Sequence, residues 1–384
     1  MSTEETPQET PQKSRYDPAV LSENEVYWKD QYGWLLEAGY RLRSRYSPDW
    51  KPSWEGKKKV EPLDCEDAQK SWFGGVNHAI RLETNRFVVL KRIDKSKHPR
   101  EIDITNSLAQ EPLASEPRNH SVHPIEILDH PTDKNIAIMV LPLLRNYDDP
   151  PFRTVGEAID FIAQFFEGVN FLHENLVTHG DISLNNILMD AEGQFPSGFH
   201  PSNPAMKSDY SGSASAKFTR TEKPPIYYLI DFGLARRFEP GEEPGFSDEV
   251  GTDLTVPEYL DSTQPVNPFF VDVYCVGNMI KYEFLDGDPQ RSSRRGYHGF
   301  EFLRPLIEDM VKHNSAERPT MAEVVARFDA EVKKLSVSTL RSRCLRKTVE
   351  EDKDPLPLVV ATTIRFWYER AMYTIRRLPP VPTR

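Results

Sequence analysis

Two short stretches of the 384-residue chain carry oxygen-bearing side chains at spacings that suit chemistry. In the first, Asp181 is followed five residues later by Asn186, with apolar residues on both sides. In the second, a strand-like run over 226–230 ends in Asp231 and Phe232-Gly233. A carboxylate can accept a proton, and carboxylate and amide oxygens bind hard cations. A capped turn is an alternative interpretation of Asp181 and Asn186. It explains neither the spacing of these two residues nor the presence of the second stretch.

A helix is expected to lead the chain into the first stretch. Thr154 and Glu157 have the spacing of a capping box. Apolar residues then recur at intervals of four, three, four and three, which predicts an amphipathic helix; these residues are Ala158, Ile162, Phe165, Val169 and Leu172. We interpret this apolar stripe as core that has no chemistry of its own.

Upstream of that helix the pattern predicts β-structure around a lysine. Residues 76–91 read as a strand, a turn and a second strand that ends in Lys91. A lysine at the end of an apolar strand is often only an edge gatekeeper. Two further strands are expected over 123–129 and 135–141.

Three other segments have a distinct composition. Residues 1–20 are rich in Glu, Thr, Pro and Gln, and we expect them to be disordered. Ser22 and Glu25 have capping-box spacing, which predicts a helix over about 22–44. Residues 193–225 are rich in Gly, Ser, Pro and Lys, and they read as a long, mostly disordered insertion between two strands.

Three downstream motifs follow in order: Glu258 after Val256-Pro257, Asp272 within 271–277, and Arg318 within 313–320. With the first two stretches, this order resembles the protein kinase family over about residues 63–335. The amino-acid sequence over residues 111–120 is similar to that of a group of fungal protein-kinase-like proteins. The resemblance implies an α+β, bilobal fold with a small β-rich N-lobe and a larger helical C-lobe. The implied activity is transfer of the ATP γ-phosphate to a Ser or Thr hydroxyl of a protein, with Mg²⁺.

Residue by residue, the resemblance implies five roles in phosphoryl transfer. Asp181 accepts the proton of the attacking hydroxyl. Asn186 and Asp231 hold Mg²⁺. Lys91 holds the α- and β-phosphates and is positioned by a helical glutamate, for which Glu101 fits the local pattern best. Glu111 is the fallback, although Pro112 disfavours a helical conformation there.

Further roles concern nucleotide binding and the lower lobe. The resemblance places Gly74 and Val76 in the phosphate loop. It places Leu141 and Leu143 at the hinge between the lobes, where the backbone contacts the nucleotide base. Asp148 would reach the ribose, or else belong to a simple turn. Asp272 would hold the backbone of the loop around Asp181, and Arg318 would form a buried pair with Glu258.

The chain departs from the kinase pattern at three places. Gln69 and Ser71 replace two phosphate-loop glycines, which should weaken nucleotide binding. Gly180 replaces the arginine that receives an activation-loop phosphate, so we predict no such switch. Ser183 replaces a lysine that neutralises the transferring phosphate. A pseudokinase scaffold is therefore the alternative to an active kinase, and a small-molecule or atypical kinase is a more distant one.

The composition limits the partners. The net charge of −11 argues against a nucleic-acid partner. The three separated cysteines suit a reducing compartment, either cytoplasmic or nuclear. The polar N-terminus does not resemble a secretory signal, and no apolar run is long enough for a membrane span.

The predicted domain organisation follows from these patterns. The C-terminal tail is basic and aromatic, typical of a membrane-surface helix or of a helix packed on the kinase lobe, and we favour packing. The expected segments are a disordered N-terminus (1–20), a helical extension (21–62), the N-lobe (63–142), the C-lobe (143–335) and the tail (336–384).

Overall fold

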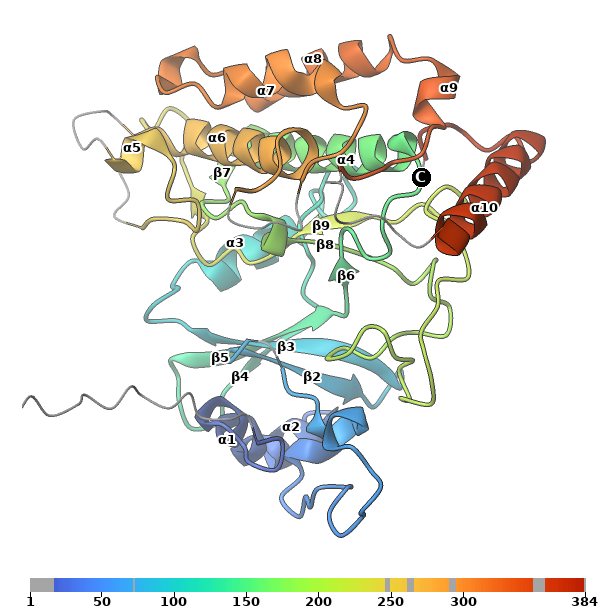
Figure 1. Ribbon diagram of the computed structural model, residues 1–384. Coiled ribbons are helices and arrows are strands. Elements are labelled where there is room, and N and C mark those ends of the chain that lie inside the picture. The colour runs from blue at the N-terminus through green and yellow to red at the C-terminus, as the bar shows by residue number, and fades with distance from the viewer. Residues whose placement is uncertain are drawn as a thin grey trace, which may run out of the picture. The chain divides into compact units, whose positions relative to one another are not determined.

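The structure is a computed structural model that describes residues 17–71, 73–245, 249–260, 266–289, 295–347 and 356–382. The chain forms two compact units, Met1–Phe87 and Val88–Arg384, and each is described by itself (Figure 1). This division does not follow the predicted boundaries at 62 and 142.

The first unit contains two short helices and a strand pair. They are α1 (Glu23–Asp30), α2 (Tyr32–Glu37), β1 (Tyr40–Leu42) and β2 (Val76–Arg81), and β1 runs antiparallel to β2. The capping box is present, because the backbone N–H of Ser22 donates to the Glu25 carboxylate at 3.0 Å. The single helix predicted over 22–44 is wrong. Gly39, with φ of 93°, provides the left-handed residue that ends a helix, and Tyr40 and Leu42 then alternate as a strand does.

The second unit begins with an antiparallel group of three strands. They are β3 (Arg86–Asp94), β4 (Glu126–Asp129) and β5 (Ile136–Pro142), and β5 pairs with both of the others. The register places Lys91 opposite Met139. Helix α3 (Glu101–Leu108) follows β3 after only six intervening residues. These elements agree with the predicted strands, and the helix is short, as the spacing from Lys91 to Glu101 indicates.

The helical part of the second unit is built around α4 (Val155–Glu174), which packs against α6 (Pro268–Ile280) and α8 (Met321–Val332). The Thr154 hydroxyl accepts from the backbone N–H of Glu157 at 3.2 Å, so the predicted capping residue begins this helix. Figure 1 shows α7 (Arg304–Met310) and α8 as a layer outside α4 and α6. The remaining short helices are α5 (Pro257–Leu260) and α9 (Val337–Leu340).

Residues 193–225 follow a defined path in the structure. The prediction that this insertion is mostly disordered is therefore wrong. Two buried arginines fix it to the rest of the unit. Arg145 lies over the rings of Phe195 and Phe199 at 4.2 and 4.8 Å and donates to the Pro204 carbonyl. Arg220 is 2% exposed and donates to the Tyr227 hydroxyl at 2.8 Å. The high Gly and Ser content predicted disorder because composition does not show that these two arginines anchor the segment.

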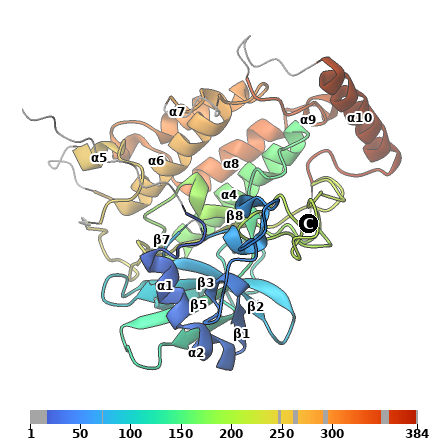
Figure 2. The same ribbon diagram turned by 60° about the horizontal axis from the view of Figure 1, so that its bottom comes forward.

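The C-terminal segment ends in a 20-residue helix, α10 (Leu356–Ile375), which stands at the margin of the second unit beside the 193–225 loop (Figure 2). Beyond it, the Pro380 carbonyl lies where a Cβ on Gly156 would be, at the start of α4. Among the helices of the described residues, none has the length and apolar character to cross a membrane.

Candidate active site

Two pairs of very short strands bring the chemically active stretches together. Strand β7 (Val177–Thr178) and strand β8 (Ile187–Met189) bracket the first stretch, while β9 (Tyr227–Leu229) and β10 (Arg236–Arg237) bracket the second. β7 pairs with β10 and β8 pairs with β9. Because the flanking strands are paired, the two loops between them must lie next to each other. The hydrogen bond from Ile230 N–H to the Asn186 carbonyl, at 3.0 Å, joins them directly.

The Asp181 carboxylate is oriented by two donors. The Asn186 amide donates to Oδ2 of Asp181 at 3.0 Å and to the Asp181 carbonyl at 2.8 Å. The backbone N–H of Thr252 donates to Oδ1 at 2.7 Å. The five-residue spacing therefore serves to close the loop on itself, and the segment after Gly251 supplies the second donor.

Asp272 of α6 fixes the backbone that precedes Asp181. Its carboxylate is 1% exposed and accepts from the N–H groups of His179 at 2.8 Å and Gly180 at 3.0 Å. His173 at the end of α4 contacts the same carboxylate at 3.1 Å. A buried carboxylate needs such donors, so this arrangement locks the loop to α6.

The local backbone explains why residue 180 is glycine. Its φ is +78°, and a Cβ there would meet the Leu234 carbonyl oxygen at 2.5 Å. The sequence shows only the missing arginine; the structure shows that the backbone here favours glycine.

Lys91 forms the centre of a charged cluster. It is ion-paired with Glu101, and its Nζ lies 2.8 Å from Oδ1 of Asp231. Burial by itself lowers the pKa of Lys91, but the charges of Glu101 and Asp231 outweigh it and raise that pKa overall. Burial likewise opposes ionisation of Asp231, yet Lys91 and the Gly233 N–H bring the pKa of Asp231 below its ordinary value. Lys91 and Asp231 are therefore both charged near neutral pH.

Glu101 is the glutamate that reaches Lys91, as the local pattern favours. Helix α3 starts at Glu101, whereas the fallback Glu111 lies beyond its last residue, Leu108. Asp231 has φ of 66°, a conformation that non-glycine residues adopt rarely. Such backbone strain is concentrated at functional sites.

Sequence reasoning missed two contacts between the α3 region and the segment after Asp231. His98 Nδ1 lies 3.2 Å from the Gly233 carbonyl oxygen. Arg100 is ion-paired with Glu249. Nothing in the local sequence marks these residues, because the partners lie 135 and 149 positions apart.

The donor set fits a magnesium ion in part. The carboxylate of Asp231, 45% exposed, and the amide oxygen of Asn186 lie on the two adjoining loops. No group of three or more His, Cys, Asp or Glu side chains suited to a metal occurs among the described residues. Mg²⁺ commonly uses one or two carboxylates together with substrate phosphates, so a larger protein cage is not required.

Glu258 and Arg318 form the buried pair that the motifs imply. The two side chains are fully buried and bidentate, at 2.7 and 2.8 Å. Arg318 also donates to the backbone carbonyls of Lys312 and Phe270. The pair thus joins α5 to the start of α8 through charge-assisted hydrogen bonds.

The predicted nucleotide-binding residues are not all gathered at this cluster. Leu141 lies in β5 opposite Val89, and Leu143 packs against the core just beyond that strand. Asp148 faces a different group, since its carboxylate lies 3.5 Å from Arg346 of the C-terminal segment.

Gly74 and Val76 belong to the first unit. A Cβ on Gly74 would meet the Asn24 side-chain amide at 2.2 Å, and the Gly74 carbonyl accepts from the Trp28 indole at 3.3 Å. Within this unit, helix α1 therefore already explains the glycine at 74.

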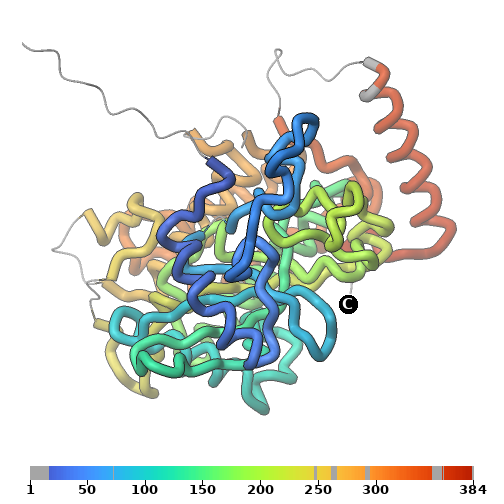
Figure 3. Tube along the Cα trace, turned by 90° about the horizontal axis from the view of Figure 1, so that it is seen from below, coloured from blue at the N-terminus to red at the C-terminus, as the bar shows by residue number. Residues whose placement is uncertain are grey.

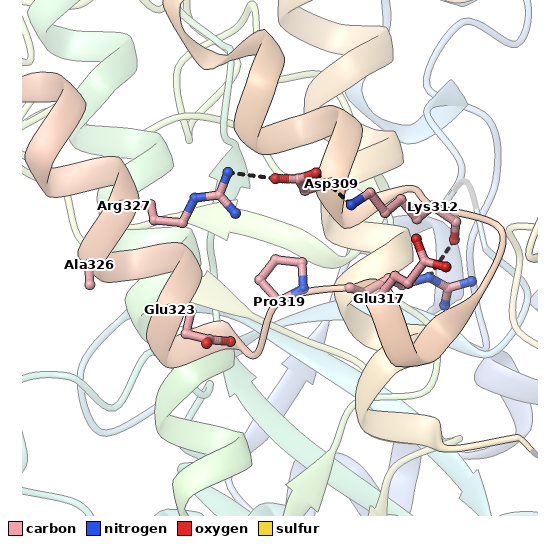
Figure 4. Close-up of a pocket in the computed structure, with 8 residues that line it drawn as sticks. Asp309, Lys312, Glu317, Pro319, Glu323, Ala326 and Arg327 are labelled. Carbon is pink, nitrogen blue, oxygen red and sulfur yellow. Dashed lines mark hydrogen bonds and ion pairs between the residues drawn. The ribbon is translucent and has the colours of Figure 1, made fainter.

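Two hollows differ in their relation to the site. A cavity of about 380 Å³ adjoins the Asp181 loop and is lined in part by Ser183, Leu184, Thr252 and Asp253. A larger hollow between α7 and α8, of about 500 Å³, is lined by charges that pair with one another, as Arg327 does with Asp309 (Figure 4). Only the first of these two hollows adjoins the loop that contains Asp181.

Comparisons with known proteins agree with this geometry. The family described as Protein kinase domain matches residues 71–328, more than half of the chain. A "Light-sensor Protein kinase" of Ceratodon purpureus is 30% identical over 224 residues, which cover 49% of this chain and 15% of the relative. "Serine/threonine-protein kinase PLK4" of Drosophila ananassae is 32% identical over 229 residues, covering 57% and 25%.

A third relative, "Cyclin-dependent kinase C-2" of Oryza sativa subsp. japonica, is 27% identical over 266 residues, covering 63% of this chain and 44% of the relative. The chain thus matches less than half the length of each of these three proteins. The family match confirms the predicted α+β, bilobal kinase fold. This chain belongs to the protein kinase domain family.

Proposed function

We propose that the chain is an active protein kinase that transfers the γ-phosphoryl group of ATP to a Ser or Thr hydroxyl of a protein, with Mg²⁺. The observation that carries this proposal is the Lys91–Glu101–Asp231 cluster beside an oriented Asp181. The two hydrogen bonds to the Asp181 carboxylate support the proposal because the reaction requires an oriented proton acceptor.

In the reaction, the hydroxyl oxygen attacks the γ-phosphorus while the bond to the β–γ bridging oxygen breaks, and the proton passes to Asp181. Oδ1 of Asp181 faces Thr252 N–H and Oδ2 faces the Asn186 amide, so the carboxylate is oriented before substrate arrives. Asp231 and Asn186 would hold Mg²⁺, which supplies charge neutralisation at the phosphates. Lys91, positioned by Glu101, would bind the α- and β-phosphates.

Two substitutions shape the rate and the regulation. Ser183 brings no positive charge to the transferring phosphate, so we expect slow turnover; each ~1.4 kcal/mol of lost stabilisation is a factor of ten. With Gly180 in place of arginine, an activation-loop phosphate has no partner at this position. We therefore propose activity without that phosphorylation, and a phosphatase treatment that abolished activity would contradict this.

A pseudokinase scaffold is the second candidate, and the phosphate loop favours it. Two of its glycines are replaced by Gln69 and Ser71, and Gly74 packs against Asn24 of α1. A small-molecule or atypical kinase is third, because the buried Glu258–Arg318 pair is typical of protein kinases.

The setting follows from the chemistry. Mg-ATP is an intracellular substrate, and the three cysteines are free thiols, as in a reducing compartment. We therefore propose a cytoplasmic or nuclear location, which fractionation of cells expressing the tagged chain would test. We do not propose a nucleic-acid partner, because the net charge is −11.

The test is Mg²⁺-dependent ATP turnover by the purified chain beside Asp181→Asn and Asp231→Asn. We expect turnover in the wild type, a large loss in both variants, and no turnover when EDTA removes Mg²⁺. Equal turnover in all three proteins would exclude the enzyme reading. Thermal stabilisation by Mg-ATP without turnover would instead support the scaffold.

A further inference from the structure

Helix α10 is attached to the second unit by one face only. Phe366 and Tyr373 are buried on that face, and the Tyr373 hydroxyl donates to Thr219 of the insertion at 2.8 Å. Glu369 is ion-paired with Arg153 in the loop before α4. Figure 3 shows the helix at the edge of the unit, with the other elements on one side of it. Packing on the kinase domain, which we favour from the tail sequence, therefore explains one face of this helix.

The opposite face is apolar and exposed. Its large side chains are between 49% and 72% exposed; they are Val360, Ile364, Trp367, Tyr368 and Ile375. At 3.6 residues per turn these positions fall within an arc of about 100°. No charged residue of the helix lies within that arc. Contiguous exposed apolar surface of this kind usually marks a site of interaction.

Arginines border this apolar stripe on both sides. By helical geometry, Arg365 lies beyond one edge and Arg370 beyond the other, whereas Arg376 and Arg377 follow the last helical residue, Ile375. Arg365 is ion-paired with Glu369, and Arg376 is ion-paired with Glu222. The stretch 356–377 contains these four arginines and a single acidic residue, Glu369, although the whole chain has a net charge of −11. The basic edges thus stand out against an acidic protein. The acidic run 350–354 precedes the helix and lies outside the described residues.

We propose that α10 is a membrane-surface helix that docks the kinase domain on an anionic lipid bilayer. The apolar stripe would enter the boundary between headgroups and acyl chains, Trp367 and Tyr368 would lie at that boundary, and the arginines would contact lipid phosphates. Because the packed face is on the other side of the helix, the domain would remain in water. This proposal is independent of catalysis.

Charge and shape favour a bilayer over a second copy of the chain. A second copy docked through the same stripe would set these arginines against one another, whereas an anionic bilayer complements them. The stripe is the convex surface of one helix, and a lipid surface requires no groove to receive it. A helix lying in the interface also does not need the length of a membrane span.

The experiment is flotation of the full chain with liposomes of phosphatidylcholine alone or with 30% phosphatidylserine, at low and at raised salt. The test variant is Ile364→Ser with Trp367→Ser, which changes two exposed side chains and should leave the thermal midpoint unchanged. The matched control is Leu63→Ser with Val20→Ser, at 55% and 62% exposure in the first unit.

We expect wild type and control to float with anionic liposomes, less so at raised salt. The test variant should partition at least about tenfold less, a change of about 1.4 kcal/mol. No flotation of the wild type, or equal flotation of the test variant, would overturn the proposal. So would analytical ultracentrifugation showing a wild-type dimer that the test variant makes monomeric, because the stripe would then join two copies.

Discussion

Replacing Gly180 by alanine tests the geometry of the catalytic loop at the position where the chain departs from other kinases. The substitution adds one Cβ to a residue with φ of +78°, and that atom would lie 2.5 Å from the Leu234 carbonyl oxygen. A left-handed conformation costs an L-residue about 1–2 kcal/mol. Moving a packed neighbour adds about 1–3 kcal/mol. We expect a total loss of about 2–5 kcal/mol in the free energy of unfolding of the second unit.

Two other glycines separate the contributions. Gly241 has φ of +84° with nothing within 4 Å of an added Cβ, so Gly241→Ala should cost only the conformational part, about 1–2 kcal/mol. Gly212 has neither a positive φ nor a close neighbour, and Gly212→Ala should be neutral or stabilise by about 0.4–1 kcal/mol.

The assay is urea unfolding of the three variants, followed by circular dichroism. The expected order of stability is Gly212→Ala, then Gly241→Ala, then Gly180→Ala. If Gly180→Ala were no less stable than Gly241→Ala, the close approach to Leu234 would be refuted. Turnover should fall with stability in Gly180→Ala alone, because only that glycine adjoins Asp181.

Three further outcomes are expected. Glu258→Gln should lower the free energy of unfolding by about 3 kcal/mol, because it leaves Arg318 as a buried charge; a loss below about 1 kcal/mol in urea unfolding would contradict the burial of the pair. Ser183→Lys should raise turnover about tenfold if the missing charge limits the rate, equivalent to ~1.4 kcal/mol; an unchanged rate would show that it does not. Asp231 has a lowered pKa, so its stabilising contribution is present above its ordinary value of 3.8 and is lost as the pH falls through the lowered value. Lys91 has a raised pKa, so its contribution is present below 10.5 and lost only above that. Lys91→Met should therefore lower the melting temperature by the same amount at pH 5 and at pH 9, and by less below pH 4. A difference between the effects at pH 5 and pH 9 would contradict the ion pair between Lys91 and Asp231.

Regular elements were predictable where periodicity and end signals agree. The apolar intervals after Thr154 gave α4, and its hydroxyl begins the helix as expected. The helix predicted over 22–44 was wrong because Gly39 ends the helical segment and the next residues pair with β2. In that register Leu42 lies opposite Ala79, which is 37 positions away in the sequence. Local pattern carries no information about such distant pairing.

The insertion shows a second limit of composition. Segments rich in Gly and Ser usually lack enough apolar area to order themselves. Here Phe195 and Phe199 of the segment are buried, and Arg145 from outside the segment stacks on both rings. The counterpart lies far away in the sequence, so the segment's own residues do not reveal it.

The site residues were accessible from sequence because the ordered motifs resemble those of the protein kinase family, which implies a role for each of them. Asp181 and Asn186 are hydrogen-bonded across five positions, and Glu101 reaches Lys91 from the first residue of α3. Contacts such as His98 to Gly233 were not accessible, since they join segments more than a hundred residues apart. The roles of these residues in phosphoryl transfer remain predictions.

The central claim is that this chain transfers phosphate to protein. The most direct measurement is transfer of label from γ-³²P-ATP with Mg²⁺ to a mixture of basic and acidic model proteins, using wild type and Asp181→Asn at equal folded concentration. We expect labelled phosphoserine or phosphothreonine in the wild-type reaction and a loss of at least about a hundredfold, near 2.7 kcal/mol, in the variant. Absence of labelled protein in the wild-type reaction, or equal labelling in both, would contradict the account.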